Sequence, residues 1–184
     1  MTVRLAFFAA ALLLAATACS SPSLDPGVVE AAAARAAEAA TPPMTLLPAS
    51  ATKLTDALLD ALSTPDLAAL PALLSDSVVF VDADGITHTG RDRVVALWTG
   101  RRAGWRSIEY ATRAHLPWKV TRAPEGGQTG TFLAVWATAM VTFTNGQARE
   151  LPVHMVLSLN EAGTIDRLAY MTDTHTMNTA GQGR

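Results

Sequence analysis

The 184-residue chain contains a single cysteine, so no disulfide bond can form within it. Aromatic residues make up 6% of the sequence and charged residues 16%, and the formal net charge is −2. A chain without a basic excess lacks the electrostatic signature of a nucleic-acid-binding protein. Phosphate-binding loops, dinucleotide-binding fingerprints and serine or cysteine nucleophile motifs are also missing. The sequence therefore predicts one small domain with no cofactor and no nucleic-acid partner.

The one long hydrophobic run lies at the N-terminus, where Arg4 precedes the apolar segment Leu5–Ala16. This run is shorter than the roughly 20 residues of a membrane span, so residues 1–18 are predicted to be a secretory signal peptide. The following Cys19, preceded by small residues, resembles the acylated cysteine of a bacterial lipobox. We therefore expect palmitate-type lipidation of Cys19, which would hold the domain on the extracytoplasmic side of a bacterial membrane. A plain cleavable signal and an uncleaved anchor are the alternatives.

Residues 19–51 have the alanine- and proline-rich composition of a tether. Within it, the run Val28–Ala40 favours a helix but offers no large apolar stripe to bury. We expect the folded domain over residues 52–177 and a disordered tail over residues 178–184.

Helices are predicted at the start of the domain. Leucine spacing predicts the first over about residues 52–62. Thr64-Pro65 is typical of the start of a second helix, with Thr64 as its N-cap. Thr89, with Asp92 three residues later, is typical of a capping box that opens a third helix.

Extended segments dominate the second half of the chain. Strands are predicted over residues 77–82 and 106–122, the latter bent at Pro117. Three more stretches, over residues 131–144, 150–160 and 164–173, predict an antiparallel meander, with Asn145-Gly146 at the first turn. Helices gathered on one side of a curved, mostly antiparallel sheet of about five to six strands make an α+β, cone-shaped half-barrel. Such a cone leaves a pocket between the sheet and the three N-terminal helices.

A series of short motifs adds a family resemblance. They are Pro65–Leu70, Leu73–Phe80, Asp82-Ala83-Asp84-Gly85, Gly90-Arg91-Asp92 and Asn145-Gly146-Gln147. In their order and spacing they resemble the nuclear transport factor 2-like superfamily, which includes SnoaL-like and ketosteroid isomerase-like domains. The resemblance covers residues 52–177 and implies the same half-barrel. This fold hosts isomerases, dehydratases, cyclases and binding domains, so it does not by itself identify a function.

Ketosteroid isomerase is the most informative member for comparison. The resemblance places its catalytic aspartate at Asp82, but its two oxyanion donors at Leu58 and Met155, which cannot donate a hydrogen bond. Steroid isomerisation by that mechanism is therefore not expected. The comparison also implies a pocket-lining strand face, with Leu58 and Trp98 added from the helices. That face consists of Trp136, Thr138, Met140, Val153, Met155, Leu157, Leu168, Tyr170 and Thr172.

Asp82 is the sharpest candidate for chemistry. A carboxylate at a strand end that faces an apolar cavity could act as a general base, or it could cap the following turn. Tyr170 could donate a hydrogen bond to a ligand carbonyl, or to a partner within the protein. The large side chains of Trp98, Trp136, Met140 and Met155 could enclose a flat apolar ligand, or they could fill the core.

The remaining polar residues suggest less. Asp173 and His175 lack a third ligand at suitable spacing, so no metal site is expected. The five arginines of the third helix and its surroundings form a basic cluster, whose ordinary explanation is a solvated helix face. Contact with an anionic lipid or substrate is the alternative. These five are Arg91, Arg93, Arg101, Arg102 and Arg106.

Three functions remain as hypotheses. The first is a lipid-anchored cell-envelope protein that binds a small apolar or amphipathic molecule in the cone. The second is an isomerase, dehydratase or cyclase that uses Asp82 as its base and Tyr170 as a partner. The third is an interaction module whose outer sheet face, around His154, Val156 and Ser158, forms a homodimer or binds an envelope partner. The first is favoured, because few groups on the implied pocket face can do chemistry.

Overall fold

The computed structural model describes residues 25–40 and 43–176. The chain divides into two units, residues 1–41 and 42–184. In the first unit, the alanine-rich run forms helix α1 (Pro26–Ala40). The predicted signal peptide, Cys19 and the tail over residues 178–184 lie outside the described residues. No helix of the described chain is both long and apolar enough to cross a membrane.

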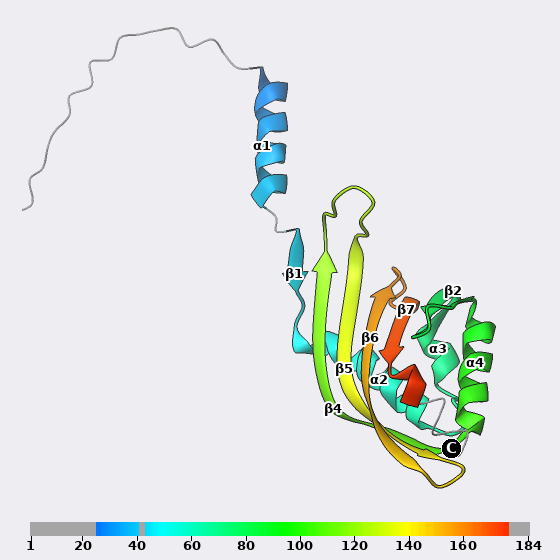
Figure 1. Cartoon of the computed structure of the whole chain (residues 1–184). Coiled ribbons are helices and arrows are strands. Elements are labelled where there is room, and N and C mark those ends of the chain that lie inside the picture. The colour runs from blue at the N-terminus through cyan, green and yellow to red at the C-terminus, as the bar shows by residue number, and fades with distance from the viewer. Residues whose placement is uncertain (1–24, 41–42, 177–184) are drawn as a thin grey trace, which may run out of the picture. The chain divides into compact units, whose positions relative to one another are not determined.

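The second unit is built on one seven-stranded sheet with the order β1-β4-β5-β6-β7-β2-β3 (Figure 1). Only the β2–β7 pair is parallel. The predicted α+β fold is therefore confirmed, and the two short strands β1 and β3 raise the strand number above the expected five to six. The strands are β1 (Met44–Leu46), β2 (Leu74–Val81), β3 (Thr87–Thr89), β4 (Trp105–Val120), β5 (Gly130–Phe143), β6 (Ala148–Leu159) and β7 (Ile165–Thr172).

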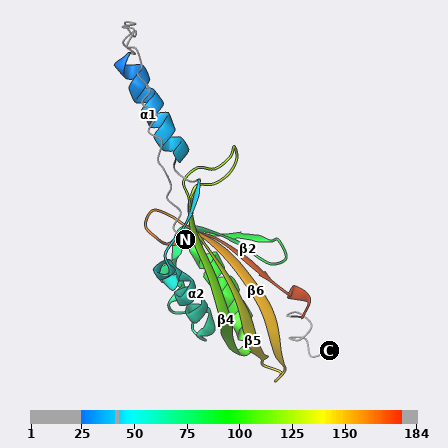
Figure 2. The same cartoon turned by 90° about the vertical axis from the view of Figure 1, so that its left-hand side faces the viewer.

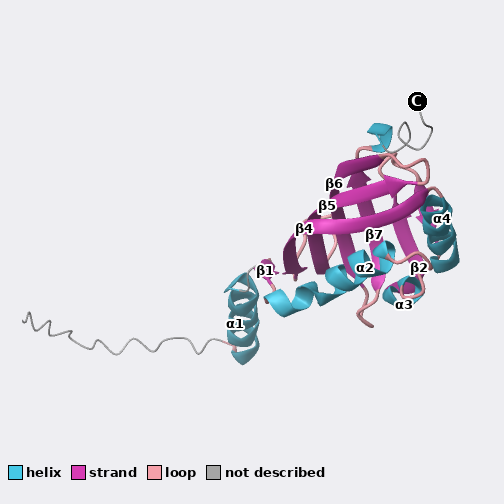
Figure 3. Ribbon diagram, turned by 90° about the horizontal axis from the view of Figure 1, so that it is seen from below, coloured by secondary structure: helices cyan, strands magenta, loops and turns pink. Residues whose placement is uncertain are grey.

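The helices that precede β4 in this unit lie on one face of the sheet, which curves around them (Figure 3). They are the 3₁₀ turn η1 (Ala49–Thr52), α2 (Lys53–Ser63), α3 (Leu70–Leu73) and α4 (Arg91–Ala103). Figure 2 shows α2 alongside the long strands β4, β5 and β6. The apolar stripe predicted for α2 is buried, with Leu58, Leu59 and Leu62 fully covered. Burial of these side chains is the main source of stability for a helix of this length.

Two predicted helix starts are wrong. Thr64 does not open a helix. It ends α2, because its hydroxyl donates to the carbonyl of Ala61 at 2.8 Å. The following helix is the single turn α3, which has Pro71 in its first turn, where a proline is tolerated. Helix α4 begins after Gly90, whose φ of +98° suits glycine, and Thr89 belongs to strand β3.

The boundary between tether and domain also differs from the prediction. Strand β1 pairs with β4, with Met44 opposite Val120 and Leu46 opposite Trp118. These residues were expected in the tether, because they lie in its proline-rich segment between Pro43 and Pro48. An edge strand tolerates such flanking prolines, since it bonds on one side only. The sheet therefore starts several residues before residue 52.

The predicted meander is confirmed by β5, β6 and β7, and its register decides which side chains face the helices. Val135 lies opposite Met155, which lies opposite Tyr170, and all three are buried. Trp136 lies opposite His154 on the other face, where it is 44% exposed. The inward positions implied for Trp136, Thr138 and Met140 are therefore wrong. When a strand is aligned with that of ketosteroid isomerase one residue out of register, all of its side chains are assigned to the opposite face of the sheet.

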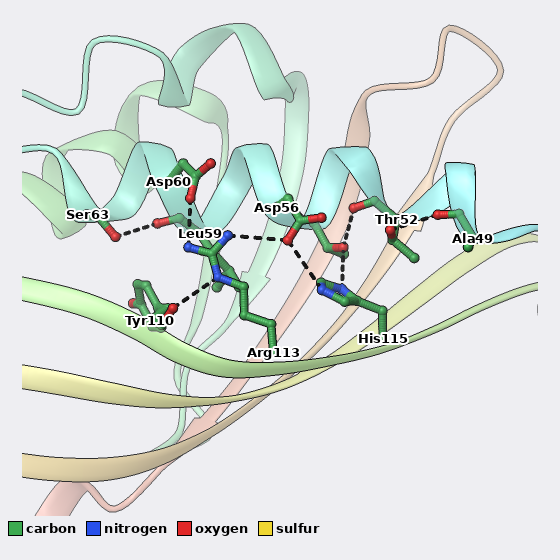
Figure 4. A network of polar contacts seen from close by, with 10 residues as sticks. Ala49, Thr52, Asp56, Leu59, Asp60, Ser63, Tyr110, Arg113 and His115 are labelled. Carbon is green, nitrogen blue, oxygen red and sulfur yellow. Dashed lines mark hydrogen bonds and ion pairs between the residues drawn. The ribbon is translucent and has the colours of Figure 1, made fainter.

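Strand β4 has a bulge between Ala111 and Ala114, where its register shifts and Thr112 has a φ of +51°. At Pro117, where a bend was predicted, its pairing with β5 is regular. Within this bulge, Arg113 contacts both acidic residues of α2: its guanidinium lies 2.7 Å from Asp60 and 3.3 Å from Asp56 (Figure 4). His115 also contacts Asp56, through Nε2 at 3.3 Å (Figure 4). These polar contacts hold α2 against the sheet near the bulge of β4.

Candidate functional site

An aromatic group fills the space between α4 and the sheet. Trp98 of α4 packs edge-on against Tyr170 of β7, with ring centroids 5.3 Å apart and planes at 84°. Phe80 of β2 completes the group, with its centroid 6.1 Å from Trp98 and 6.4 Å from Tyr170. Trp105, at the start of β4, lies edge-on to Trp98 at 6.4 Å. Edge-to-face packing of this kind is favourable because the positive ring edge meets the negative ring face.

Arg101 lies over this aromatic group and pairs with Asp82. Its guanidinium carbon is 5.0 Å from the Trp98 ring centroid and 5.9 Å from those of Phe80 and Tyr170. Its Nη2 atom donates to Oδ2 of Asp82, which is only 8% exposed. The other carboxylate oxygen of Asp82 accepts a hydrogen bond of 2.7 Å from the Ala83 amide. The carboxylate of Asp82 therefore binds the amide of the next residue and, beside the aromatic group, the guanidinium of Arg101.

Two further polar side chains are buried next to this pair. Arg102 is 6% exposed, lies 6.0 Å from the Trp105 ring centroid and forms no ion pair with any described residue. Burial lowers the pKa of Arg102, and the neighbouring Tyr110 acts in the opposite direction. Tyr110 of β4 is itself buried.

Both tyrosines of the chain lie at this place. Burial raises the pKa of Tyr170 to about 12 and that of Tyr110 well above its usual 10. The two hydroxyls lie close enough to affect each other's ionisation, yet the Tyr110 hydroxyl is outside hydrogen-bonding geometry. At neutral pH both phenols therefore keep their protons and can act as donors.

We call these side chains the buried polar cluster: Asp82, Trp98, Arg101, Arg102, Tyr110 and Tyr170. Several of its donors have no hydrogen-bond partner among the described residues. They are Nε1 of Trp98, Nη1 of Arg101, Nε and Nη1 of Arg102, and the Tyr110 hydroxyl. Buried polar atoms are nearly always paired in proteins, so a group of unpaired donors in one place indicates a missing partner.

The cluster unites some predicted site residues and leaves others out. Asp82, Tyr170 and Trp98 meet here, while Leu58, Met155 and Leu168 are fully buried in the adjoining core. Trp136, Thr138 and Met140 lie across the sheet, on its outer face.

Arg101, Arg102 and Tyr110 were not predicted as site residues. Helical spacing could have indicated both arginines, because they follow the buried Trp98 by three and four positions. Alternation along β4 could have indicated Tyr110, two residues after the buried Ile108. The explanation of these arginines as a solvated helix face is wrong for Arg101 and Arg102, because both fold inward.

Three cavities of the structure lie elsewhere. One cavity, of about 410 Å³, lies beside the β4–β5 connection and is lined by Phe132 of β5 and Arg167 of β7. A second, of about 510 Å³, adjoins the start of α4, and a third, of about 170 Å³, lies between β5 and β6. None of these three is lined by the buried polar cluster, where aromatic side chains pack against one another. In the described part of the chain, no three His, Cys, Asp or Glu side chains are placed to hold a metal ion.

Comparison with known proteins identifies the architecture. The SnoaL-like domain family matches residues 55–168. No curated protein matches the chain.

Solved structures also share the fold. A proposed polyketide cyclase from Pseudomonas putida KT2440 is 22% identical over 68% of this chain and 92% of its own, with a TM-score of 0.55. A proposed SnoaL-like polyketide cyclase from Shewanella denitrificans OS-217 is 14% identical over 74% of this chain and 100% of its own, with a TM-score of 0.57. A protein with a ketosteroid isomerase-like fold from Catenulispora acidiphila was crystallised with trimethylamine. It is 18% identical over 64% of this chain and 83% of its own, with a TM-score of 0.50. At these identities the likeness establishes a shared fold and not a shared activity.

Proposed function

Because the chain belongs to the SnoaL-like family, we propose that it binds a small organic molecule between α4 and the sheet, at the buried polar cluster. The observation that carries this proposal is the group of unpaired donors on Trp98, Arg101 and Arg102. A ligand with hydrogen-bond acceptors would pair them and would pack on the aromatic rings around them. The ligand is therefore expected to be amphipathic rather than purely apolar.

The relatives with solved structures support a small-molecule ligand. Two are named as proposed polyketide cyclases, and a third was crystallised with trimethylamine. Because the aromatic side chains fill the interior, entry of a ligand requires them to move. Arg101 has a side chain that is 18% exposed, so the Asp82–Arg101 pair is the place where solvent comes nearest to the cluster.

Calorimetric titration of the full chain with 2-acetylnaphthalene and 2-naphthoate tests this function. At least one of these flat, oxygen-bearing probes should bind, and Trp98→Phe should weaken that binding because it removes the indole donor. The exposed tryptophan of the outer face gives the matched control, since Trp136→Phe should leave affinity unchanged. Absence of binding by both probes, or equal effects of the two variants, would contradict the proposal.

A second candidate function is catalysis, as an isomerase, dehydratase or cyclase that uses Asp82 as a base. It is favoured by the buried position of Asp82 beside the phenol of Tyr170, which can donate to a developing oxyanion. The ion pair with Arg101 opposes it, because a paired carboxylate is a weaker base. Under this hypothesis, Asp82→Asn removes turnover of a substrate that the variant still binds. Turnover that persists in the variant would exclude Asp82 as the base.

Lipid anchoring through Cys19 completes the proposal. Acylation of the only cysteine would place the domain at an extracytoplasmic membrane surface, with residues 19–41 as a spacer. Radiolabelled palmitate supplied to a bacterium expressing the full chain should be incorporated into the protein, and Cys19→Ser should abolish incorporation. Equal labelling of the two would exclude Cys19 as the acceptor.

A homodimer is proposed for the outer face of the sheet. Large apolar side chains are exposed there, where a soluble monomer would usually place polar residues. They are Leu116, Trp136, Met140 and Met171. The stacked rings of Trp136 and His154, 4.7 Å apart, lie on the same face. Light scattering should give the mass of a dimer for the full chain in detergent, and Trp136→Glu should shift it toward the monomer. A monomer at all concentrations would contradict this assembly.

A further inference from the structure

We propose that the ligand of the buried polar cluster is an aromatic organic anion whose negative group is held by Arg102, with Trp98 and Arg101 as additional donors. This inference rests on the proposed function and names the chemical class of the ligand.

The buried polar cluster carries an excess of positive charge. The cluster holds two guanidinium groups, on Arg101 and Arg102, and one carboxylate, on Asp82. Asp82 pairs with Arg101, so the charge of Arg102 has no counter-ion within the described part of the chain. A buried cation without a partner is costly, and an anion entering the site would remove that cost.

The unpaired nitrogens of the buried polar cluster are all hydrogen-bond donors. Indole and guanidinium nitrogens can only donate, so the missing partner must be an acceptor. A water molecule could serve one of them, but it brings two donors of its own into a site that already has an excess. A carboxylate or enolate brings only acceptors, so its oxygens can accept from unpaired donors of Arg102 and of the neighbouring side chains without adding a donor.

Aromatic rings surround the two arginines of the cluster. Trp98, Trp105 and Phe80 present flat apolar surfaces around the guanidinium groups. An aromatic or conjugated ring can stack on such surfaces while its charged group reaches the arginines. Inorganic phosphate or sulfate would use the charge but not these surfaces.

A purely structural role for Arg102 is the competing explanation. It lies in the last turn of α4, where a cation favours the negative end of the helix dipole. That effect satisfies a charge preference but leaves Nε and Nη1 of Arg102 without acceptors. Only the ligand explanation predicts discrimination between charged and neutral molecules of equal shape.

The test compares 2-naphthoate with 2-naphthamide, which share a ring system and differ in charge, by calorimetry on the full chain near pH 7. We expect the anion to bind at least about tenfold tighter, as for a buried charge-assisted hydrogen bond. Arg102→Met should remove this preference, and Arg102→Lys should keep part of it. Arg106→Met is the matched control, because Arg106 is an exposed arginine close in sequence, and it should leave the preference intact.

Each outcome decides something. Equal affinity of the acid and the amide for the wild-type chain would leave the proposed function standing and overturn the anionic class. Failure of both probes to bind would contradict both proposals. An unchanged preference in Arg102→Met would remove Arg102 from the site. If Arg102→Met does not fold, the wild-type comparison still decides the anionic class. The role of Arg102 is then tested with Arg102→Lys, which keeps the charge and should lower 2-naphthoate affinity more than 2-naphthamide affinity. Equal losses of the two affinities would count against Arg102.

Discussion

Arg101 and Asp82 form an ion pair that ties the last turn of α4 to the end of β2. Both side chains are largely buried, and the arginine also covers the rings of Phe80, Trp98 and Tyr170. The pair therefore joins two elements of the fold and at the same time sets the charge of the candidate site.

Breaking this pair should be costly. Asp82→Asn leaves Arg101 as an uncompensated, mostly buried cation, and we expect the free energy of unfolding to fall by about 2–4 kcal/mol. Urea denaturation monitored by circular dichroism measures this change. Asp76→Asn is the control, because Asp76 pairs with Arg91 at the surface and should change stability by less than about 0.5 kcal/mol. Equal effects of the two substitutions would show that the Asp82 pair is solvated.

Alkaline pH should unfold the protein through its two tyrosines. Both tyrosines are neutral in the folded and in the unfolded state well below pH 10. Above it, the unfolded chain releases protons that the folded chain holds, because burial raises the pKa of Tyr170 to about 12 and that of Tyr110 well above 10. The unfolding free energy should therefore decrease between pH 10 and about 12, by up to about 1.4 kcal/mol per pH unit for each tyrosine.

Phenolate absorbance near 295 nm provides a direct readout, since the chain has only two tyrosines. The signal should be absent from the folded protein at pH 10 and should rise together with the loss of circular dichroism. Tyr170→Phe should make the pH dependence of stability shallower. Free titration of either tyrosine near pH 10 in the folded state would contradict its burial.

The two faces of the sheet can be distinguished with one substitution type. Met155→Ala removes a fully buried side chain of β6 and should lower stability by about 3 kcal/mol. Met140→Ala acts on a side chain of β5 that is 40% exposed, and should cost less than about 1 kcal/mol. Both residues were expected on the same pocket face, so thermal or urea denaturation of this pair tests the register directly. Similar losses for both variants would place Met140 inside.

The contact between α2 and β4 should be weak and sensitive to salt. A double-mutant cycle with Arg113→Ala and Asp60→Ala should give a coupling energy of about 0.5 kcal/mol, because both groups are partly solvated. In 1 M NaCl this coupling should largely disappear, since the screening length falls to about 3 Å. A coupling that is unchanged by salt would indicate a more deeply buried pair than the structure contains.

Local chemistry was enough to predict much of this fold. Alternating apolar residues and the Asn145-Gly146 turn predicted the meander of β5, β6 and β7, and the motif order predicted the family. The outward position of His154 was also predicted correctly, because Val153 and Met155 on either side of it are buried. Such features depend on neighbours within a few residues, so they can be inferred before the chain is folded.

The face of β5 and the composition of the site depended on tertiary structure. Both faces of β5 are apolar in sequence, so alternation cannot tell Val135 from Trp136, and only pairing with β6 and packing against the helices separates them. The arginines illustrate the same limit. Their spacing from Trp98 allowed either an inward or a solvated position, and the inward one became favourable for Arg101 only because folding brings Asp82 from β2 beside it.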